Sequence, residues 1–211
     1  MIHFLDDNGY LYTQKNTRHM NYKEALKFYP DFPIEGVNFV DVIPFLQNKE
    51  LFRGITRDLG VLCASPNVTA PEARGFLYAA PLLLECPNVM NIIPLRKKGK
   101  LPYSGEDLQQ VDIEKEYGHD EVFFRLSDVA AGQPSGDTIE VTFFDDILAT
   151  GGTARGIAEA FNCLTVTKDG REYRVKVTDF VFLVEISDLP GREILEPLAP
   201  VKALIKVEEG L

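Results

Sequence analysis

The sequence predicts an α/β fold in which helices flank a mainly parallel central sheet, because short apolar segments alternate with amphipathic ones along the chain. The strongest strand signal is the run of β-branched and aromatic residues at 138–144, and a helical pattern over about 153–161 follows it. A second buried strand is expected at 89–95. The 211 residues suffice for one domain with a small addition.

The first third of the chain is expected to supply a hairpin, two helices and a strand. Turn residues and prolines mark the ends of these elements. In order, we expect a hairpin over 2–12, a short helix over 22–28 that Asn21 caps and that Pro30 and Pro33 end, an apolar stretch over 36–42, an amphipathic helix over 46–62 and a strand over 67–70.

The rest of the chain continues the alternation, interrupted by one long polar segment. A loop of that length in a compact domain is usually functional or disordered. In order, we expect a helix over 75–85 bent at Pro81, the strand 89–95, a loop over 96–110, antiparallel strands at 111–117 and 122–126, the strand and helix at 138–161, a hairpin formed by 164–167 and 173–177, and strands at 180–186 and 203–207.

Composition and charge limit the classes of function. With 22 basic and 32 acidic residues the net charge is −10, which argues against a nucleic-acid-binding protein, because such proteins need a basic face. A small phosphorylated ligand needs only a local basic cluster, and four of the five residues at 96–100 are basic. As a charge run alone, this cluster is also typical of a solvated surface.

The cysteines and histidines give no sign of a metal site built by the protein. Three widely spaced cysteines and three scattered histidines lack the spacing of zinc or iron ligands. Asp6 and Asp7 argue against a signal peptide, and the apolar run at 76–84 is too short to cross a membrane. We therefore expect a cytoplasmic protein without a membrane partner.

The segment most informative about function is TIEVTFFDDILATGGT at 138–153. An apolar strand is expected to end at two adjacent carboxylates, Asp145 and Asp146, and a loop of small residues then leads into a helix. Parallel α/β sheets bind ligands beyond the carboxyl ends of their strands, and a glycine-rich loop before a helix offers backbone N–H groups to a phosphate. No Gly-Lys-Ser/Thr follows, so this is not a Walker loop. On these residues alone, a strand end followed by a capped turn stays an alternative.

This segment resembles the phosphoribosyl-pyrophosphate motif of the type I phosphoribosyltransferases, in the form found in the adenine phosphoribosyltransferase family. Other segments resemble that family in the same order along the chain. They are FPIEGVNFVD at 32–41, EARGFL at 72–77, PLRKKGKLP at 94–102, EYG at 116–118, VE at 184–185 and GRE at 191–193. The resemblance implies a small N-terminal extension, residues 1–31, before a phosphoribosyltransferase domain, residues 32–211, with a flexible lid at about 96–118.

The resemblance also implies the residues that bind 5-phosphoribosyl 1-pyrophosphate (PRPP) and act on it. The phosphate-binding and ribose-binding residues are Arg74, Arg96, Lys97, Lys100, Asp145, Asp146, Ala149, Thr150, Gly151, Gly152 and Thr153. Glu116 would be the acid/base and Tyr117 would help to close the lid over the site. Without the resemblance, Glu116 would be one more acid in an exposed strand of alternating acids.

The base pocket shows one departure from the family pattern. Phe39 and Ile147 resemble the pair that sandwiches the purine, and Asn38 would offer backbone groups to the ring edge. The family commonly has Arg directly after the Phe, whereas this chain has Val40. Loss of a hydrogen bond from a charged group costs about 1.5–3 kcal/mol, so another residue compensates, the base preference differs, or activity is low.

The implied reaction is purine salvage, in which adenine and PRPP give AMP and pyrophosphate. Mg²⁺ is the expected cofactor, held mainly by substrate oxygens, with Asp145 or Asp146 reaching it through a water. The resemblance further implies a homodimer. One alternative is the same reaction on hypoxanthine or guanine, which only Val40 supports. The other is a nucleotide-sensing regulator without activity, which would need a basic DNA-reading module.

Overall fold

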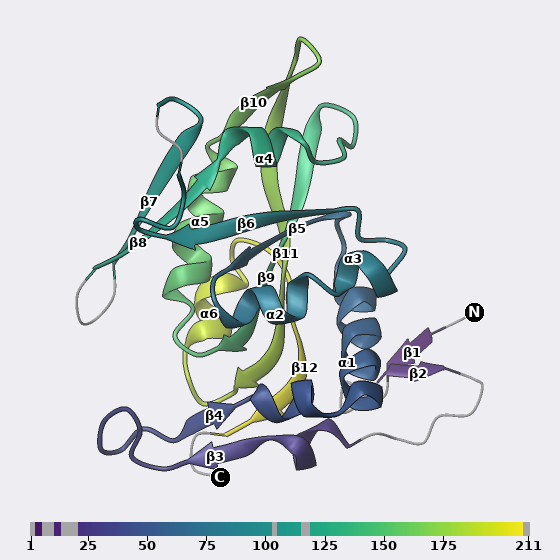
Figure 1. Cartoon of the computed structure of the whole chain (residues 1–211), viewed down its shortest axis with the longest axis vertical. Helices are drawn as coiled ribbons and strands as arrows, with labels where there is room; N and C mark the ends of the chain where they lie inside the picture. Colours follow the sequence, from purple (N-terminus) through teal and green to yellow (C-terminus); the bar gives the residue numbers. More distant parts are fainter. Residues whose placement is uncertain (1–2, 6–10, 14–20, 103–104, 115–118, 209–211) are drawn as a thin grey trace.

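In the computed structural model, residues 3–5, 11–13, 21–102, 105–114 and 119–208 are described. They form an eight-stranded mixed sheet at the centre of the molecule (Figure 1). The parallel strands are, in spatial order, β12 (Val201–Val207), β11 (Arg171–Ile186), β9 (Thr138–Leu148), β5 (Asn67–Pro71) and β6 (Asn91–Lys97). Antiparallel strands complete it: β10 (Thr165–Lys168) beside β11, and β8 (His119–Arg125) and β7 (Leu108–Glu114) beyond β6. The predicted α/β class with a mainly parallel sheet is confirmed.

The sheet is buried on both faces, which explains why its strands are almost continuously apolar. Neighbouring residues of β9, Phe143 and Phe144, are both fully buried but belong to different hydrophobic clusters. Successive side chains of a strand point to opposite faces, so the two clusters are the two faces of the sheet. The first contains residues of α4 (Leu126–Ala130), α5 (Gly152–Asn162) and α6 (Gly191–Leu195), and the second contains residues of α1 (Lys49–Leu62), α2 (Arg74–Ala79) and α3 (Leu82–Glu85).

Local signals set most helix boundaries. The helix expected over 46–62 begins at Lys49, because the side chain of Asn48 caps it by accepting the N–H of Leu51 at 3.1 Å. A short 3₁₀ helix, Ile43–Gln47, precedes it. The helix expected over 75–85 is interrupted at Pro81, which separates α2 from α3. None of the helices in the described parts of the chain is long and apolar enough to cross a membrane.

The prediction of a helix over 22–28 is wrong beyond the first turn. A 3₁₀ helix, Tyr22–Ala25, is followed by strand β3 (Lys27–Tyr29), which pairs antiparallel with β4 (Phe39–Asp41). The register sets Phe28 opposite Val40, so pairing with a distant segment outweighs the local helical signal. The expected boundary at residues 31 and 32 lies in the connection of this small sheet.

Several strands are longer than expected because pairing continues past the apolar core. β9 extends through Leu148, which pairs with Glu185, and 171–186 form one strand with a bulge between Val177 and Asp179. The expected loop over 96–110 is shorter, since β6 reaches Lys97 and β7 begins at Leu108. The structure also contains two short helices that the sequence did not predict, α4 and α6. Strands β1 (His3–Leu5) and β2 (Leu11–Thr13) pair as the expected hairpin, whose turn lies outside the described residues.

Candidate functional site

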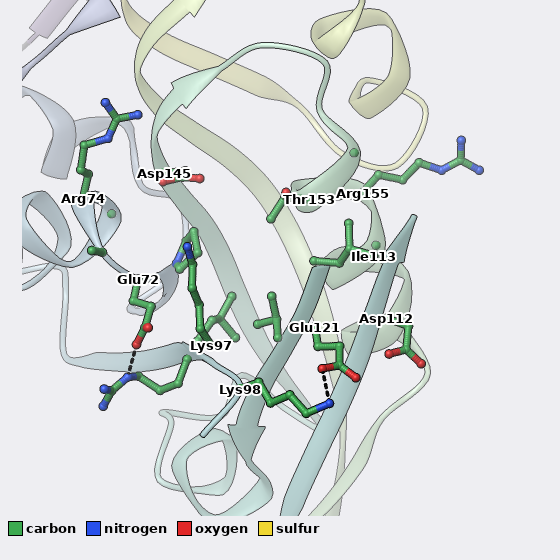
Figure 2. A pocket seen from close by; sticks show the side chains of 18 of the residues that line it. Glu72, Arg74, Lys97, Lys98, Asp112, Ile113, Glu121, Asp145, Thr153 and Arg155 are labelled. Atoms are coloured by element: carbon green, nitrogen blue, oxygen red, sulfur yellow. Dashed lines mark hydrogen bonds and ion pairs between the residues drawn. The ribbon is translucent and has the colours of Figure 1, made fainter. Parts of the chain in front are cut away.

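A pocket of about 1470 Å³ opens where β5, β6 and β9 approach their carboxyl ends (Figure 2). This is where ligands of parallel α/β sheets bind. Seven of the residues expected to bind phosphate or ribose line it. They are Arg74, Arg96, Lys97, Asp145, Asp146, Gly152 and Thr153.

The two adjacent carboxylates lie inside β9 rather than at its end, which corrects the expected boundary. Asp145 lies against Gly75, where an added Cβ would be 3.0 Å from Oδ1 of Asp145. The same Oδ1 accepts the backbone N–H of Asp146 at 2.8 Å. Burial, together with the neighbouring charge of Asp146, raises the pKa of the Asp145 carboxyl well above its ordinary value. Since a raised pKa means that the charged carboxylate is disfavoured, a hydrogen-bond donor or a positive charge beside Asp145 would stabilise it.

Arg74 connects the expected phosphate side of the site with the expected base side. Its Nε lies 2.7 Å from Oδ2 of Asp146, whose side chain is nearly buried. Its guanidinium also lies over the ring of Phe39, 5.3 Å from the centroid, and Phe32 meets the same ring edge-to-face at 5.2 Å. One cation thus touches both a carboxylate of β9 and an aromatic ring of β4.

The glycine-rich loop leads from β9 into α5 as the sequence predicts. Gly151 caps the helix with φ of +78°, a left-handed conformation that favours glycine. Gly152 and Thr153 line the pocket at the first turn of α5, where backbone N–H groups have no partner within the helix. Ala149, Thr150 and Gly151 lie just before this wall, and Thr150 is exposed. The N-terminal end of a helix that follows such a loop has the backbone geometry and dipole that favour an anion.

The basic cluster divides into paired and exposed side chains. Arg96 donates to Glu72, and Nζ of Lys98 lies 2.8 Å from Glu121. Lys97 is exposed and extends into the pocket (Figure 2). Lys100 is exposed in the turn that follows β6, and the described pocket wall does not include it.

None of the expected base residues is among the described residues that line the pocket, and they lie in different environments. Asn38 and Phe39 are half-buried, and so is Ile147, which packs against the second hydrophobic cluster. Val40 is only 4% exposed and belongs to that cluster. Position 40 therefore presents an apolar side chain to the core. Glu116 and Tyr117 lie outside the described residues.

Sequence reasoning missed several residues of the pocket wall. Glu72 and Gly75 stand within the quoted segment at 72–77, and their neighbour Arg74 was a signal for both. Arg155 and Glu159 also line the pocket and pair at 2.8 Å. Their spacing of four residues on a helix was the available signal.

The donor set fits Mg²⁺ only if the substrate supplies most ligands. Among the described residues, no group of three or more His, Cys, Asp or Glu side chains could hold a metal ion. Asp145 and Asp146 offer hard carboxylate oxygens at the pocket wall, which is the ligand type that Mg²⁺ prefers. Mg²⁺ usually keeps several waters and substrate oxygens, so two protein carboxylates are compatible with it.

A mainly parallel sheet with adjacent carboxylates near a strand end and a glycine-rich loop before a helix defines an α/β protein that binds a phosphorylated ligand. The chain is 32% identical over 192 residues to adenine phosphoribosyltransferase of Methanococcus maripaludis, covering 90% of this chain and 99% of the relative. It therefore belongs to the adenine phosphoribosyltransferase family. No protein-family model matches the chain.

Solved structures agree with this assignment. The crystal structure of adenine phosphoribosyltransferase from Thermoanaerobacter pseudethanolicus matches with a TM-score of 0.72 and 32% identity, over 88% of this chain and 98% of that one. The enzyme from Saccharomyces cerevisiae, solved with adenine and an imino-altritol bisphosphate, matches with a TM-score of 0.68 and 30% identity, over 87% and 96% of the two chains.

Proposed function

We propose that this chain transfers the phosphoribosyl group of PRPP to adenine, forming AMP and releasing pyrophosphate. Membership of the family supports the reaction. The observation that carries the proposal is one pocket that is lined by the carboxylates of β9, by Gly152 and Thr153 at the end of the loop 149–153, and by cations that include Arg74 and Lys97. These groups match the ribose hydroxyls, the 5′-phosphate and the pyrophosphate of PRPP respectively.

The ribose 5-phosphate half fits the end of β9. The 5′-phosphate is placed on the loop at 149–153, where free N–H groups and the positive end of α5 favour an anion. Hydroxyl groups of Thr150 and Thr153 add donors beside it. The carboxylates of Asp145 and Asp146 accept hydrogen bonds from the two ribose hydroxyls. Burial raises the pKa of Asp145 because it disfavours the charged carboxylate. A hydroxyl that donates a hydrogen bond stabilises that charged form.

The pyrophosphate half fits the opposite wall, where Arg74, Arg96 and Lys97 would bind it, and Lys100 would reach it from the turn that follows β6. An arginine can contact two phosphate oxygens at once, whereas a lysine supplies a point charge. Arg74 and Arg96 are paired with carboxylates, so pyrophosphate exchanges one anionic partner for another. Mg²⁺, when bound, would neutralise charge on the leaving pyrophosphate.

The base is placed between Phe39 and Ile147, with backbone groups of Asn38 at its edge. A purine on the Phe39 ring needs the space above it that Arg74 now occupies, so Arg74 moves toward the pyrophosphate as the base enters. The bond from the ring nitrogen to the anomeric carbon forms as the bond from that carbon to pyrophosphate breaks. We assign acceptance of the ring-nitrogen proton to Glu116, and closure of the lid at 96–118 to Tyr117. Water exclusion by the lid prevents hydrolysis of PRPP.

The same proposal includes three further features: an extension at 1–31 before a domain at 32–211, a homodimer, and a cytoplasmic location. They rest on the resemblance to the family.

Product formation tests the function. Purified protein with Mg²⁺ and PRPP is given adenine, hypoxanthine or guanine separately, and nucleotides are resolved by chromatography. We expect AMP from adenine only, with activity lowered about 10²–10⁴-fold in Glu116→Gln, the usual contribution of a general acid or base. Asp146→Asn should also lose activity. The matched control is Asp137→Asn, because Asp137 also pairs with an arginine at 2.7 Å, but on an exposed surface.

The outcomes separate the alternatives. IMP or GMP in place of AMP would make Val40 part of a change in base specificity. No nucleotide from any base would contradict the transferase function and favour a nucleotide-sensing protein.

A further inference from the structure

The first residue of α6 touches the phosphate loop from outside the pocket wall. Gly191 donates its N–H to the carbonyl of Ala149 at 3.0 Å. Its Cα and carbonyl oxygen would each lie 3.1 Å from a Cβ added at Gly151. A Cβ at Gly191 itself would lie 2.2 Å from the carbonyl oxygen of Ala149. Two glycines thus bring the backbones of α6 and the loop into direct contact.

The next residue, Arg192, connects α6 to the neighbouring strands. Its Nε and Nη2 each donate to the Glu185 carboxylate at 2.6 Å, a two-point contact that sets both distance and direction. Nη1 donates to the carbonyl of Val201 at 2.9 Å and to Glu196 at 3.0 Å. These contacts hold Arg192 against β11, α6 and the start of β12.

Glu185, the partner of Arg192, is buried in the central sheet. It is 3% exposed and pairs in register with Leu148, the last residue of β9 before the loop. Burial alone would raise the pKa of Glu185, but the hydrogen bonds and charge of Arg192, helped by the nearby Lys206, outweigh it and lower the pKa, so the carboxylate stays charged. The pair is linked to the loop through Gly191, which precedes Arg192 directly and contacts Ala149 and Gly151.

We propose that Arg192 is a positioning residue for PRPP: held by Glu185 and acting through Gly191, it keeps the loop at 149–153 in the shape that binds the 5′-phosphate. This inference rests on the proposed function, because it assumes that the loop binds the phosphate of PRPP. A loop anchored on a rigid strand keeps its N–H groups aimed at the ligand before binding.

Steady-state kinetics with each substrate varied in turn test the proposal. Arg192→Gln should raise KM for PRPP about tenfold or more while KM for adenine stays within about twofold, since a small displacement of binding groups is enough for such losses. Arg192→Lys should fall between, because lysine keeps the charge but not the two-point contact. Arg174→Gln is the matched control. Arg174 lies on β11, the strand that also carries Glu185, and pairs with Asp137 at 2.7 Å, but its side chain is exposed.

Calorimetric binding of ribose 5-phosphate separates this inference from the function itself. If the wild type binds ribose 5-phosphate but forms no AMP, the function fails, and weaker binding by Arg192→Gln still supports the inference. If Arg192→Gln does not fold, Glu185→Gln is measured instead, because glutamine keeps the shape of the Glu185 side chain and weakens its pair with Arg192. The KM of Glu185→Gln for PRPP should also rise. Unchanged KM for PRPP and unchanged ribose 5-phosphate binding in the variant that folds would overturn the proposal. Equal rises in KM for both substrates would do the same.

Discussion

Replacing Gly151 by alanine isolates the contribution of the phosphate loop. A residue other than glycine in the left-handed region costs roughly 1–2 kcal/mol, which lowers Tm by roughly 2–8 °C in a chain of this size. At Gly151 the φ is +78°, and the new Cβ would also lie 3.1 Å from backbone atoms of Gly191. The backbone at residue 151 or at Gly191 must then move by a few tenths of an ångström. We expect KM for PRPP to rise about tenfold, below the ~10²-fold that a displacement of 1 Å can cause.

Gly170→Ala is the control for backbone strain. Gly170 has φ of +75° in the turn between β10 and β11, and nothing lies within 4 Å of an added Cβ. Both variants should lose stability in thermal unfolding, Gly151→Ala more than Gly170→Ala because of its contact with Gly191, but only Gly151→Ala should raise KM for PRPP. If Gly151→Ala keeps the KM of the wild type despite its lower Tm, the loop does not bind the phosphate and the reasoning fails.

Three further changes follow from other contacts. Arg74→Ala should lower kcat/KM about 10- to 150-fold, the equivalent of about 1.5–3 kcal/mol for a charged hydrogen bond; an unchanged value in steady-state assays would exclude Arg74 from the site. Asp179→Ala should lower the free energy of unfolding in urea by about 3 kcal/mol, because its carboxylate is 1% exposed and bonded to an N–H, a hydroxyl and a lysine. The KM values should not change, and a loss below about 1 kcal/mol would mean that water replaces those contacts. The pKa of Glu185 in the folded protein is lowered from its ordinary value of 4.5. The charged carboxylate therefore stabilises the fold fully above pH 4.5, and this stabilisation is lost as the pH falls through the folded-state pKa. The stability gap between wild type and Glu185→Gln should therefore narrow below about pH 4.5, and a gap that widens in acid would contradict the ion pair with Arg192.

Local sequence patterns were sufficient for the elements whose signals are local. The strand at 138–144, the helix that follows it and the break at Pro81 all depend on residues close in sequence. Features set by distant pairing were not predicted, namely the strand at Lys27–Tyr29 and the extension of β9 beyond residue 144. Phe28 lies in a strand because Val40 pairs with it, and β9 continues to Leu148 because β11 accompanies it.

The same distinction applies to the site. Asp145, Asp146 and the loop after them were predictable because they are contiguous in sequence. The contact of Arg74 with the Phe39 ring joins segments 35 residues apart, and no periodicity indicates it. Arg192 is similar: its motif is visible in the sequence, but its relation to the loop depends on the turn of the chain after β11.

A crystal structure with AMP and Mg²⁺ would test the account most directly. The account predicts the phosphate on the backbone N–H groups at 149–153, the ribose hydroxyls on Asp145 and Asp146, and adenine stacked on Phe39 with Arg74 moved away from that ring. AMP bound elsewhere, or bound with its phosphate away from the loop before α5, would contradict it.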